Sequence, residues 1–178
     1  PNMTVWRPCD TVETVYAWKH AVENNDGPTS LIFSRQGLPR QHRTEEQFEN
    51  ISRGAYVLFE TDENPENILI ATGSEVSLAL ESAKVLGAQG VSVRVVSMPC
   101  VEVFEQQDAS YQEQVLPNAV RKRVAIEAAH VDYWRKWVGL DGAVVGMESF
   151  GASAPGGDLY RHFGFTVENV VGKVKGLS

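Results

Sequence analysis

The protein has 178 residues, of which 43% are hydrophobic and 22% charged, and its formal net charge at pH 7 is −7. This composition is typical of a globular protein with a substantial core, and the length corresponds to one domain or slightly more. The acidic balance argues against a nucleic-acid partner, because neutralising phosphates requires a basic surface. No apolar run approaches the ~20 residues needed to span a bilayer, so we expect no membrane association.

The amino terminus and the cysteines bear on the cellular compartment. Residues 1–6 lack the basic start and apolar core of a signal peptide, and because the chain does not begin with methionine we expect it to be cut from a longer chain. Cys9 and Cys100 lie far apart without C-x-x-C spacing, which predicts free buried thiols in a reducing, cytoplasmic environment. The four histidines are scattered, which argues against a zinc site.

The opening segment predicts one helix and one strand. Asp10 and Glu13 have the spacing of a capping box, and apolar residues recur at helical intervals to about Asn24. Leu31–Phe33 then predicts a short buried strand. Because two elements cannot close a fold, we expect this segment to be the end of a larger domain. The polar residues 37–53 predict an interdomain connection with one short helix.

The remainder predicts a second, more complete unit in which strands alternate with helices. The strands are expected at residues 55–59, 68–71, 91–96, 123–126 and 143–146. A helix over residues 76–86 joins two of these strands in a βαβ unit, which implies a right-handed parallel crossover. A Trp-rich stretch around residues 133–137 and the apolar spacing from Leu159 to Val174 predict further helices. This alternation predicts a three-layer α/β/α sandwich.

Arg35 is the candidate binding residue that this element order singles out. It follows the predicted strand at Leu31–Phe33, and in open α/β sheets ligands collect at the carboxyl ends of strands. Its guanidinium offers a planar fork of donors that suits a phosphate or a carboxylate. An arginine that pairs with a nearby carboxylate to hold a loop fits the position equally well. The residues alone therefore leave both an anion site and a structural ion pair open.

Two glycine-containing segments have simpler interpretations than catalytic ones. The turn at residues 72–75 lacks the glycines of a nucleotide loop, and Glu75 would compete with a phosphate, so we expect Thr72 and Glu75 to form a helix cap. Residues 151–155 are similar to a nucleophile elbow, but Pro155 replaces the second glycine and no histidine partner is identifiable. A hydrolase is therefore disfavoured, and we expect this loop to be buried against a neighbouring domain or subunit.

Histidines and aromatic residues give weaker functional signals. Glu127, His130 and Asp132 are candidates for a carboxylate–imidazole pair, although capping and interface roles are commoner at strand ends. His20 is expected to be solvated on its helix. The aromatic residues around 133–137 have helical spacing and are expected in a core or a subunit interface.

A series of motifs in fixed order gives a more specific prediction than any single residue. The motifs are Trp6-Arg7-Pro8-Cys9-Asp10, Gly27-Pro28-Thr29, Ser34-Arg35-Gln36, Ile70-Ala71-Thr72-Gly73-Ser74-Glu75-Val76, Arg94-Val95-Val96-Ser97-Met98-Pro99, Val115-Leu116-Pro117, Gly139-Leu140-Asp141-Gly142, Phe150-Gly151-Ala152-Ser153-Ala154-Pro155 and Phe163-Gly164-Phe165-Thr166-Val167-Glu168-Asn169-Val170-Val171. Across essentially its whole length, the chain resembles the carboxyl-terminal part of bacterial-type transketolases. Dihydroxyacetone synthase and 1-deoxyxylulose-phosphate synthase, which use the same cofactor, are the nearest chemical alternatives.

The resemblance implies a fold, an activity and a division of the chain. Residues 1–53 would be the end of a pyrimidine-binding domain with its linker, and residues 54–178 a carboxyl-terminal domain with a mixed, mostly parallel five-stranded sheet. The full enzyme would use thiamine diphosphate with Mg²⁺ or Ca²⁺ to transfer a two-carbon ketol unit between sugar phosphates, in the pentose phosphate pathway and Calvin cycle. It would act as a homodimer whose active sites lie between the subunits.

The resemblance assigns a role to Arg35 alone. In the family, the arginine of the S-R-Q motif grips the phosphate of the sugar substrate. The catalytic, cofactor-binding and metal-binding residues of the family would lie upstream, so this chain by itself is expected to be inactive. The alternatives are that residues 54–178 form a regulatory module for a small anion or nucleotide, at 72–75 or 151–157, or a scaffold that stiffens the dimer.

Overall fold

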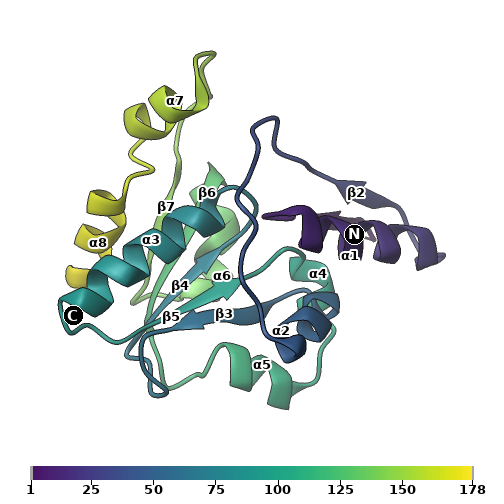
Figure 1. Ribbon diagram of the computed structural model, residues 1–178, viewed down its shortest axis with the longest axis horizontal. Coiled ribbons are helices and arrows are strands. Elements are labelled where there is room, and N and C mark those ends of the chain that lie inside the picture. Colours follow the sequence, from purple (N-terminus) through teal and green to yellow (C-terminus); the bar gives the residue numbers. More distant parts are fainter. Residues whose placement is uncertain (1, 178) are drawn as a thin grey trace.

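The computed structural model describes residues 2–177 and contains two sheets, one in each part of the chain (Figure 1). The amino-terminal unit consists of β1 (Thr4–Trp6), α1 (Thr11–Glu23) and β2 (Thr29–Leu31), with β1 and β2 paired in parallel. Asp10 caps α1, since its Oδ1 accepts the N–H groups of Val12 and Glu13. The helix predicted from Asp10 to about Asn24 is therefore confirmed.

The connection between the two parts contains one short helix, as predicted. Helix α2 (Glu45–Asn50) begins with a capping box between Thr44 and Gln47 and leads into the 3₁₀ turn η1 (Ile51–Arg53). The Gln47 side chain also reaches the next strand, where its Nε2 donates to the carbonyl groups of Val57 and Leu58 at 2.9 and 3.1 Å. The connection is thus packed against the domain that follows it.

The larger sheet has five strands in the order β3-β5-β4-β6-β7. Their bounds are β3 Tyr56–Glu60, β4 Asn67–Ala71, β5 Val93–Ser97, β6 Lys122–His130 and β7 Ala143–Met147. Strand β3 runs antiparallel to β5, and the other neighbours are parallel. This is the mixed, mostly parallel sheet that the sequence predicts.

Helices cover both faces of this sheet and make the three layers (Figure 1). The helices of this part are α3 (Glu75–Ala88), α4 (Val101–Glu105), α5 (Ala109–Val115), η2 (Val131–Trp134), α6 (Arg135–Val138), α7 (Gly156–His162) and α8 (Val167–Lys175). Side chains alternate across β4, so that Leu69 joins the core beneath α3 and α8 while Ile68 and Ile70 join the core beneath α4, α5 and α6. The hydrophobic core beneath α3 also takes in Trp6 and Ala17 of the amino-terminal unit.

Two local features differ from the predictions. Strand β2 ends at Leu31, and Ile32 and Phe33, predicted as buried, are 47% and 45% exposed because β2 pairs with β1 alone among the described residues. The short helices α4 and α5 were not predicted, since five to seven residues give too little periodicity.

No described helix is long and apolar enough to cross a membrane.

Candidate functional site

The Arg35 loop follows β2 and projects from the molecule. The Gln36 N–H donates to Ser34 Oγ at 3.1 Å, which folds the tip into a local turn, and Arg35 between them is exposed. Among residues 2–177, no hydrogen bond or ion pair joins the Arg35 side chain to the rest of the chain. The structural ion pair considered for this residue is therefore not seen in the described part of the chain.

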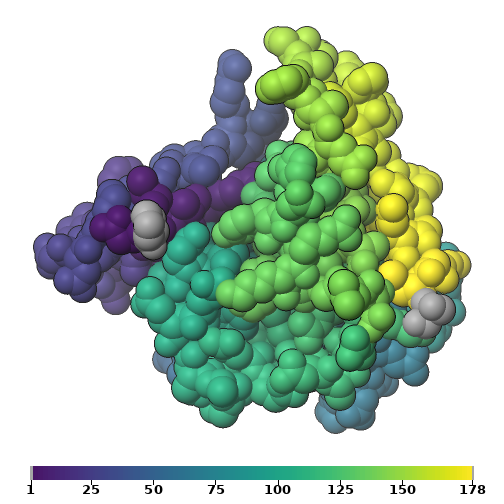
Figure 2. Space-filling model, turned by 180° about the vertical axis from the view of Figure 1, so that it is seen from behind, coloured from purple at the N-terminus to yellow at the C-terminus, as the bar shows by residue number. Residues whose placement is uncertain are grey.

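This loop faces the glycine-rich loop before α7 across a notch, with hollows at its base. Figure 2 shows the two loops rising on either side of an open gap. A hollow of about 260 Å³ lies between the Arg35 loop and the start of α1, and another of about 220 Å³ lies between it, α3 and α7. Ser34 and Gln36 line both hollows. The loops nearly touch at Gly156, where an added Cβ would lie 3.2 Å from Gln36 Nε2.

A buried polar cluster fixes the base of this loop to both parts of the chain. Arg43 is fully buried and donates to Asp10 Oδ2 at 2.6 Å and to the Tyr56 hydroxyl at 2.7 Å. Asp10 Oδ2 also accepts the Gln41 N–H at 2.9 Å, which fastens the end of the loop. Glu13 completes the cluster, because it accepts hydrogen bonds from the Tyr56 hydroxyl, the Ser97 hydroxyl and the Cys9 N–H at 2.7–2.8 Å.

The protonation states of this cluster follow from burial and from Arg43. Burial alone would raise the pKa of Asp10, but hydrogen bonds from Arg43 and from the N–H groups of Gln41 and Glu13 outweigh it and lower the pKa below its ordinary value. Burial, together with the charges of Glu13 and Asp10, raises the pKa of the Cys9 thiol well above its usual range. The cluster therefore contains an ionised carboxylate–guanidinium pair next to a neutral thiol.

A second ionic cluster lies at the carboxyl ends of β4, β5 and β6. The Arg7 N–H donates to the Pro99 carbonyl at 2.8 Å, and the Arg7 carbonyl accepts from the Gly73 N–H at 3.0 Å. The Arg7 guanidinium binds two carboxylates, those of Glu75 at the start of α3 and of Glu127 in the second half of β6. In open α/β sheets this edge is where ligands bind. Here an arginine of the amino-terminal unit occupies part of it.

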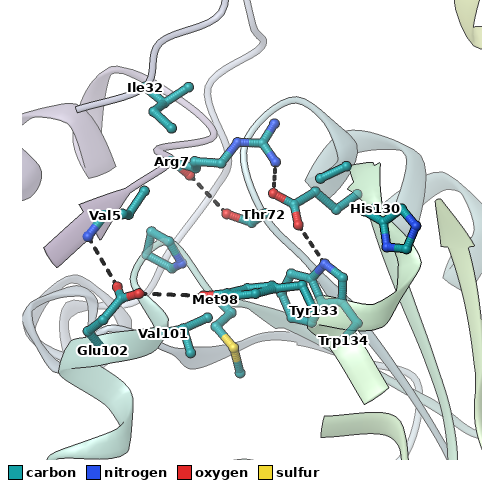
Figure 3. Close-up of a pocket in the computed structure, with 13 residues that line it drawn as sticks. Val5, Arg7, Ile32, Thr72, Met98, Val101, Glu102, His130, Tyr133 and Trp134 are labelled. Carbon is teal, nitrogen blue, oxygen red and sulfur yellow. Dashed lines mark hydrogen bonds and ion pairs between the residues drawn. The ribbon is translucent and has the colours of Figure 1, made fainter. Parts of the chain in front are cut away.

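A pocket of about 390 Å³ opens beside Arg7 (Figure 3). Its walls are mostly apolar, with Met98, Val101 and Trp134 among the lining side chains. Glu102 lies at one end, where its Oε2 accepts the Val5 N–H at 3.1 Å, and the Arg7–Glu127 pair lies at the other. The pocket thus lies between the amino-terminal unit and the larger sheet.

The structure corrects the predicted cap at residues 72–75. Ser74 is the residue that precedes α3, and Thr72 donates its hydroxyl to the Arg7 carbonyl instead of accepting from the helix. Glu75 is fully buried and accepts hydrogen bonds from Ser74, Arg7 and the Tyr160 hydroxyl. An anion at this helix start would meet a buried carboxylate, so nucleotide binding here is not favoured.

The predicted histidine roles have mixed outcomes. A carboxylate–imidazole pair is present on the surface, where His130 Nδ1 lies 3.6 Å from Asp132 and also caps η2 by accepting the Asp132 N–H at 3.4 Å. Glu127 is outside this pair and binds Arg7 and the Trp134 indole N–H. His20, predicted as solvated, packs against Trp6 with ring centroids 5.4 Å apart, and burial lowers its pKa.

Two aromatic and loop predictions have mixed outcomes. Trp134 and Trp137 are buried in the core beneath α4 and α5, whereas Tyr133 is 52% exposed. Residues 151–155 are exposed to solvent in the described chain, and their burial against a neighbouring domain or subunit stays a prediction.

The described residues do not fit a diphosphate and divalent-metal site. Within residues 2–177, no group of three His, Cys, Asp or Glu side chains is arranged to hold a metal ion. The carboxylates of Asp10, Glu13, Glu75 and Glu127 already accept hydrogen bonds from the protein.

The fold and the two ionic clusters define an α/β protein in which a unit with a two-stranded parallel sheet packs against a domain with a mixed five-stranded sheet. Comparison with known families identifies both parts. The transketolase pyrimidine-binding domain matches residues 1–41, and the transketolase-like C-terminal domain matches residues 54–166. The chain therefore belongs to the transketolase family.

Individual relatives agree with this assignment. Over 177 residues the chain is 59% identical to transketolase 1 of Escherichia coli strain K12, an alignment that covers 99% of this chain and 27% of that protein. The solved structure of transketolase from Leishmania mexicana has a TM-score of 0.91 at 42% identity, and the Pichia stipitis transketolase in complex with sedoheptulose-7-phosphate has 0.90 at 36%. Both alignments cover 99% of this chain and 25% of the other. The chain thus spans about a quarter of the length of these relatives.

Proposed function

We propose that this chain is the carboxyl-terminal part of a transketolase, which transfers a two-carbon ketol unit from a ketose phosphate to an aldose phosphate in the pentose phosphate pathway. The observation that carries the proposal is the 59% identity with the Escherichia coli enzyme across 99% of the chain. We place the domain boundary between residues 53 and 54 and the enzyme in the cytoplasm. A regulatory anion site at residues 72–75 is not favoured, because Glu75 and Arg7 fill that position.

Within this reaction we assign Arg35 the contact with the phosphate of the sugar. Arg35 is exposed, lies between Ser34 and Gln36, which line the two hollows, and has no described protein partner, so its donors are available to a ligand. A guanidinium can hold a phosphate through two parallel hydrogen bonds. That contact orients the far end of the sugar and thereby helps to position the reacting carbonyl group.

The test is a ketol-transfer assay on the full-length enzyme with Arg35→Ala. Loss of a charged hydrogen bond worth about 1.5–3 kcal/mol should raise KM for phosphorylated sugars about tenfold to hundredfold. Unphosphorylated ketoses should show a much smaller change. Arg40→Ala is the matched control, because Arg40 is another exposed arginine of the same connection. An equal rise in KM for phosphorylated and unphosphorylated sugars would contradict the phosphate role of Arg35.

We further propose that thiamine diphosphate and its Mg²⁺ or Ca²⁺ are held by parts of the enzyme outside these 178 residues. The support is that the buried carboxylates of the described chain already accept hydrogen bonds from other protein groups. Isothermal titration of thiamine diphosphate with Mg²⁺ into this chain should give no heat of binding. Micromolar affinity would contradict the proposal.

The outer face of α1 is a candidate contact surface. Val15, Trp18 and Val22 are 62%, 54% and 77% exposed, and Trp18 stacks on Phe33. Apolar side chains gathered in this way mark a surface that another part of the protein or a partner covers. We propose that the rest of the pyrimidine-binding domain covers this face, and that the longer enzyme is a homodimer, as the family resemblance implies. Light scattering should give twice the monomer mass for the full-length enzyme.

A further inference from the structure

The pocket beside Arg7 has the location and size of a small-molecule site. It lies where β4, β5 and β6 end, and β4 has β5 on one side and β6 on the other, which makes this the switch point of the sheet. Its volume of about 390 Å³ is within the usual range for ligand pockets and suits a bicyclic ring. Of the residues that line it, Val5, Arg7 and Ile32 come from the amino-terminal unit and the others from the larger domain.

The charges around the pocket select against anions. Arg7 is the guanidinium at its inner end, and it is shared between the carboxylates of Glu127 and Glu75. Glu102 adds a third carboxylate at the opposite end. Two carboxylates, Glu102 and Glu127, therefore line the pocket with one guanidinium that Glu75 also neutralises from outside it, and His130 lies at the exposed rim. Burial and then the charges of Glu102 and Glu127 raise the pKa of Tyr133, as expected in a negative environment.

The apolar walls and Glu102 define the complementary ligand. Met98 and Trp134 line the pocket but are each 1% exposed, so a flat ring would contact chiefly Ile32 and Tyr133, which are 47% and 52% exposed (Figure 3). Glu102 Oε2 is bound to the Val5 N–H, whereas its Oε1 has, within residues 2–177, only a long contact of 3.5 Å with the Tyr133 hydroxyl. That oxygen has remaining capacity to accept a hydrogen bond from a charged donor.

We propose that this pocket binds a small aromatic amine, with its ring against Ile32 and Tyr133, next to Met98, and its ammonium group at Glu102. The site is separate from the Arg35 loop and independent of ketol transfer. It takes the opposite charge to the sugar phosphates proposed for Arg35.

Methionine methyl resonances provide a position-specific test on the 178-residue chain. The chain has three methionines, of which Met98 lines the pocket, while Met3 and Met147 do not. In a sample labelled with ¹³C at the methionine methyl groups, tryptamine should shift the Met98 signal, assigned with Met98→Leu, and leave the others in place. Indole-3-propionate, which has a similar ring with an anionic tail, should bind at least about fivefold more weakly, the effect of one partly exposed ion pair.

Glu102→Gln should remove the preference for tryptamine, and its amide oxygen can still accept the Val5 N–H. Glu105→Gln is the matched control, because Glu105 lies on the same helix but pairs with Lys136 outside the pocket. It should keep the preference. The proposal is overturned if the Met98 signal does not move at millimolar tryptamine, or if the anion binds as well as the amine. It is also overturned if a folded Glu102→Gln variant retains the full preference.

Discussion

Arg43→Met should destabilise the protein strongly, because Arg43 is the cation that neutralises the cluster between its two parts. The side chains of Arg43, Asp10 and Glu13 are all fully buried, and Arg43 lies 2.6 Å from Asp10 and 3.5 Å from Glu13. Methionine is of similar length and apolar, so the substitution removes the charge while largely filling the space. It leaves buried carboxylates without a cation, for which the usual cost is about 3–5 kcal/mol.

Urea unfolding followed by far-UV circular dichroism gives the required measurement. With a slope of about 2 kcal/mol per molar urea, a loss of about 4 kcal/mol lowers the midpoint by about 2 M. Arg121→Met is the control, because Arg121 forms an ion pair with Asp141 in which both side chains are largely exposed, at 70% and 49%. Such a pair contributes under about 1 kcal/mol, so the control should move the midpoint by less than about 0.5 M.

A second substitution tests the cause of the effect. If the unpaired charge is responsible, the double variant Arg43→Met with Asp10→Asn should lose less stability than the sum of the losses in the two single variants. The reason is that the asparagine amide needs no counter-ion. The reasoning would be refuted if Arg43→Met moved the midpoint no further than the exposed control. Strict additivity of Asp10→Asn and Arg43→Met would also refute it.

Three further predictions concern pH, backbone conformation and the thiols. Burial lowers the pKa of His20 below its ordinary value of 6.5, so the contribution of His20 to stability is complete above pH 6.5 and declines as the pH falls below 6.5. His20→Phe should therefore reduce the fall in urea midpoint that accompanies acidification below pH 6.5. An unchanged fall would disprove this prediction. Gly54→Ala should lower the free energy of unfolding by about 2–3 kcal/mol, because Gly54 has a φ of 85° and an added Cβ would press on the Cys100 carbonyl. Gly151 has open space around it, so Gly151→Ala should be nearly neutral in the same urea assay. Burial raises the pKa of the Cys100 thiol to about 12, so Ellman's reagent should label it only after unfolding, and rapid labelling of the native protein would contradict this.

The parts of the fold that depend on local periodicity could be predicted from the sequence. Short turns separate three successive elements: the strand from Ile68, the helix after Ser74 and the strand to Val96. Each element buries residues in the pattern typical of a buried strand or of an amphipathic helix. The number of strands and their mixed, mostly parallel sense came from the family resemblance, and the strand order was not predicted, because spacing within one βαβ unit does not show on which side β6 is added.

The ionic clusters could not be predicted, because their members lie far apart in the sequence. Arg7 and Glu127 are separated by 120 residues, and Glu13 and Ser97 by 84. A glutamate at the start of a helix is usually a solvated cap residue, which is why Glu75 was interpreted in that way. The one available signal was Arg7 itself, which occurs within the Trp6–Asp10 motif used for the family resemblance. The exposure of Arg35 is compatible with its predicted role, which stays a prediction.

The contacts of Gln47 with β3 have a practical consequence for anyone who divides this protein. Strand β3 forms the outer border of the larger sheet, and Gln47 occupies two of its outward-facing carbonyl groups. A bare border strand is a template for pairing with strands of other molecules, which leads to aggregation. A recombinant domain that starts at residue 54 would lose this protection. Expression of the isolated domain should therefore begin before Thr44, which caps the helix that carries Gln47, although the family match starts at residue 54.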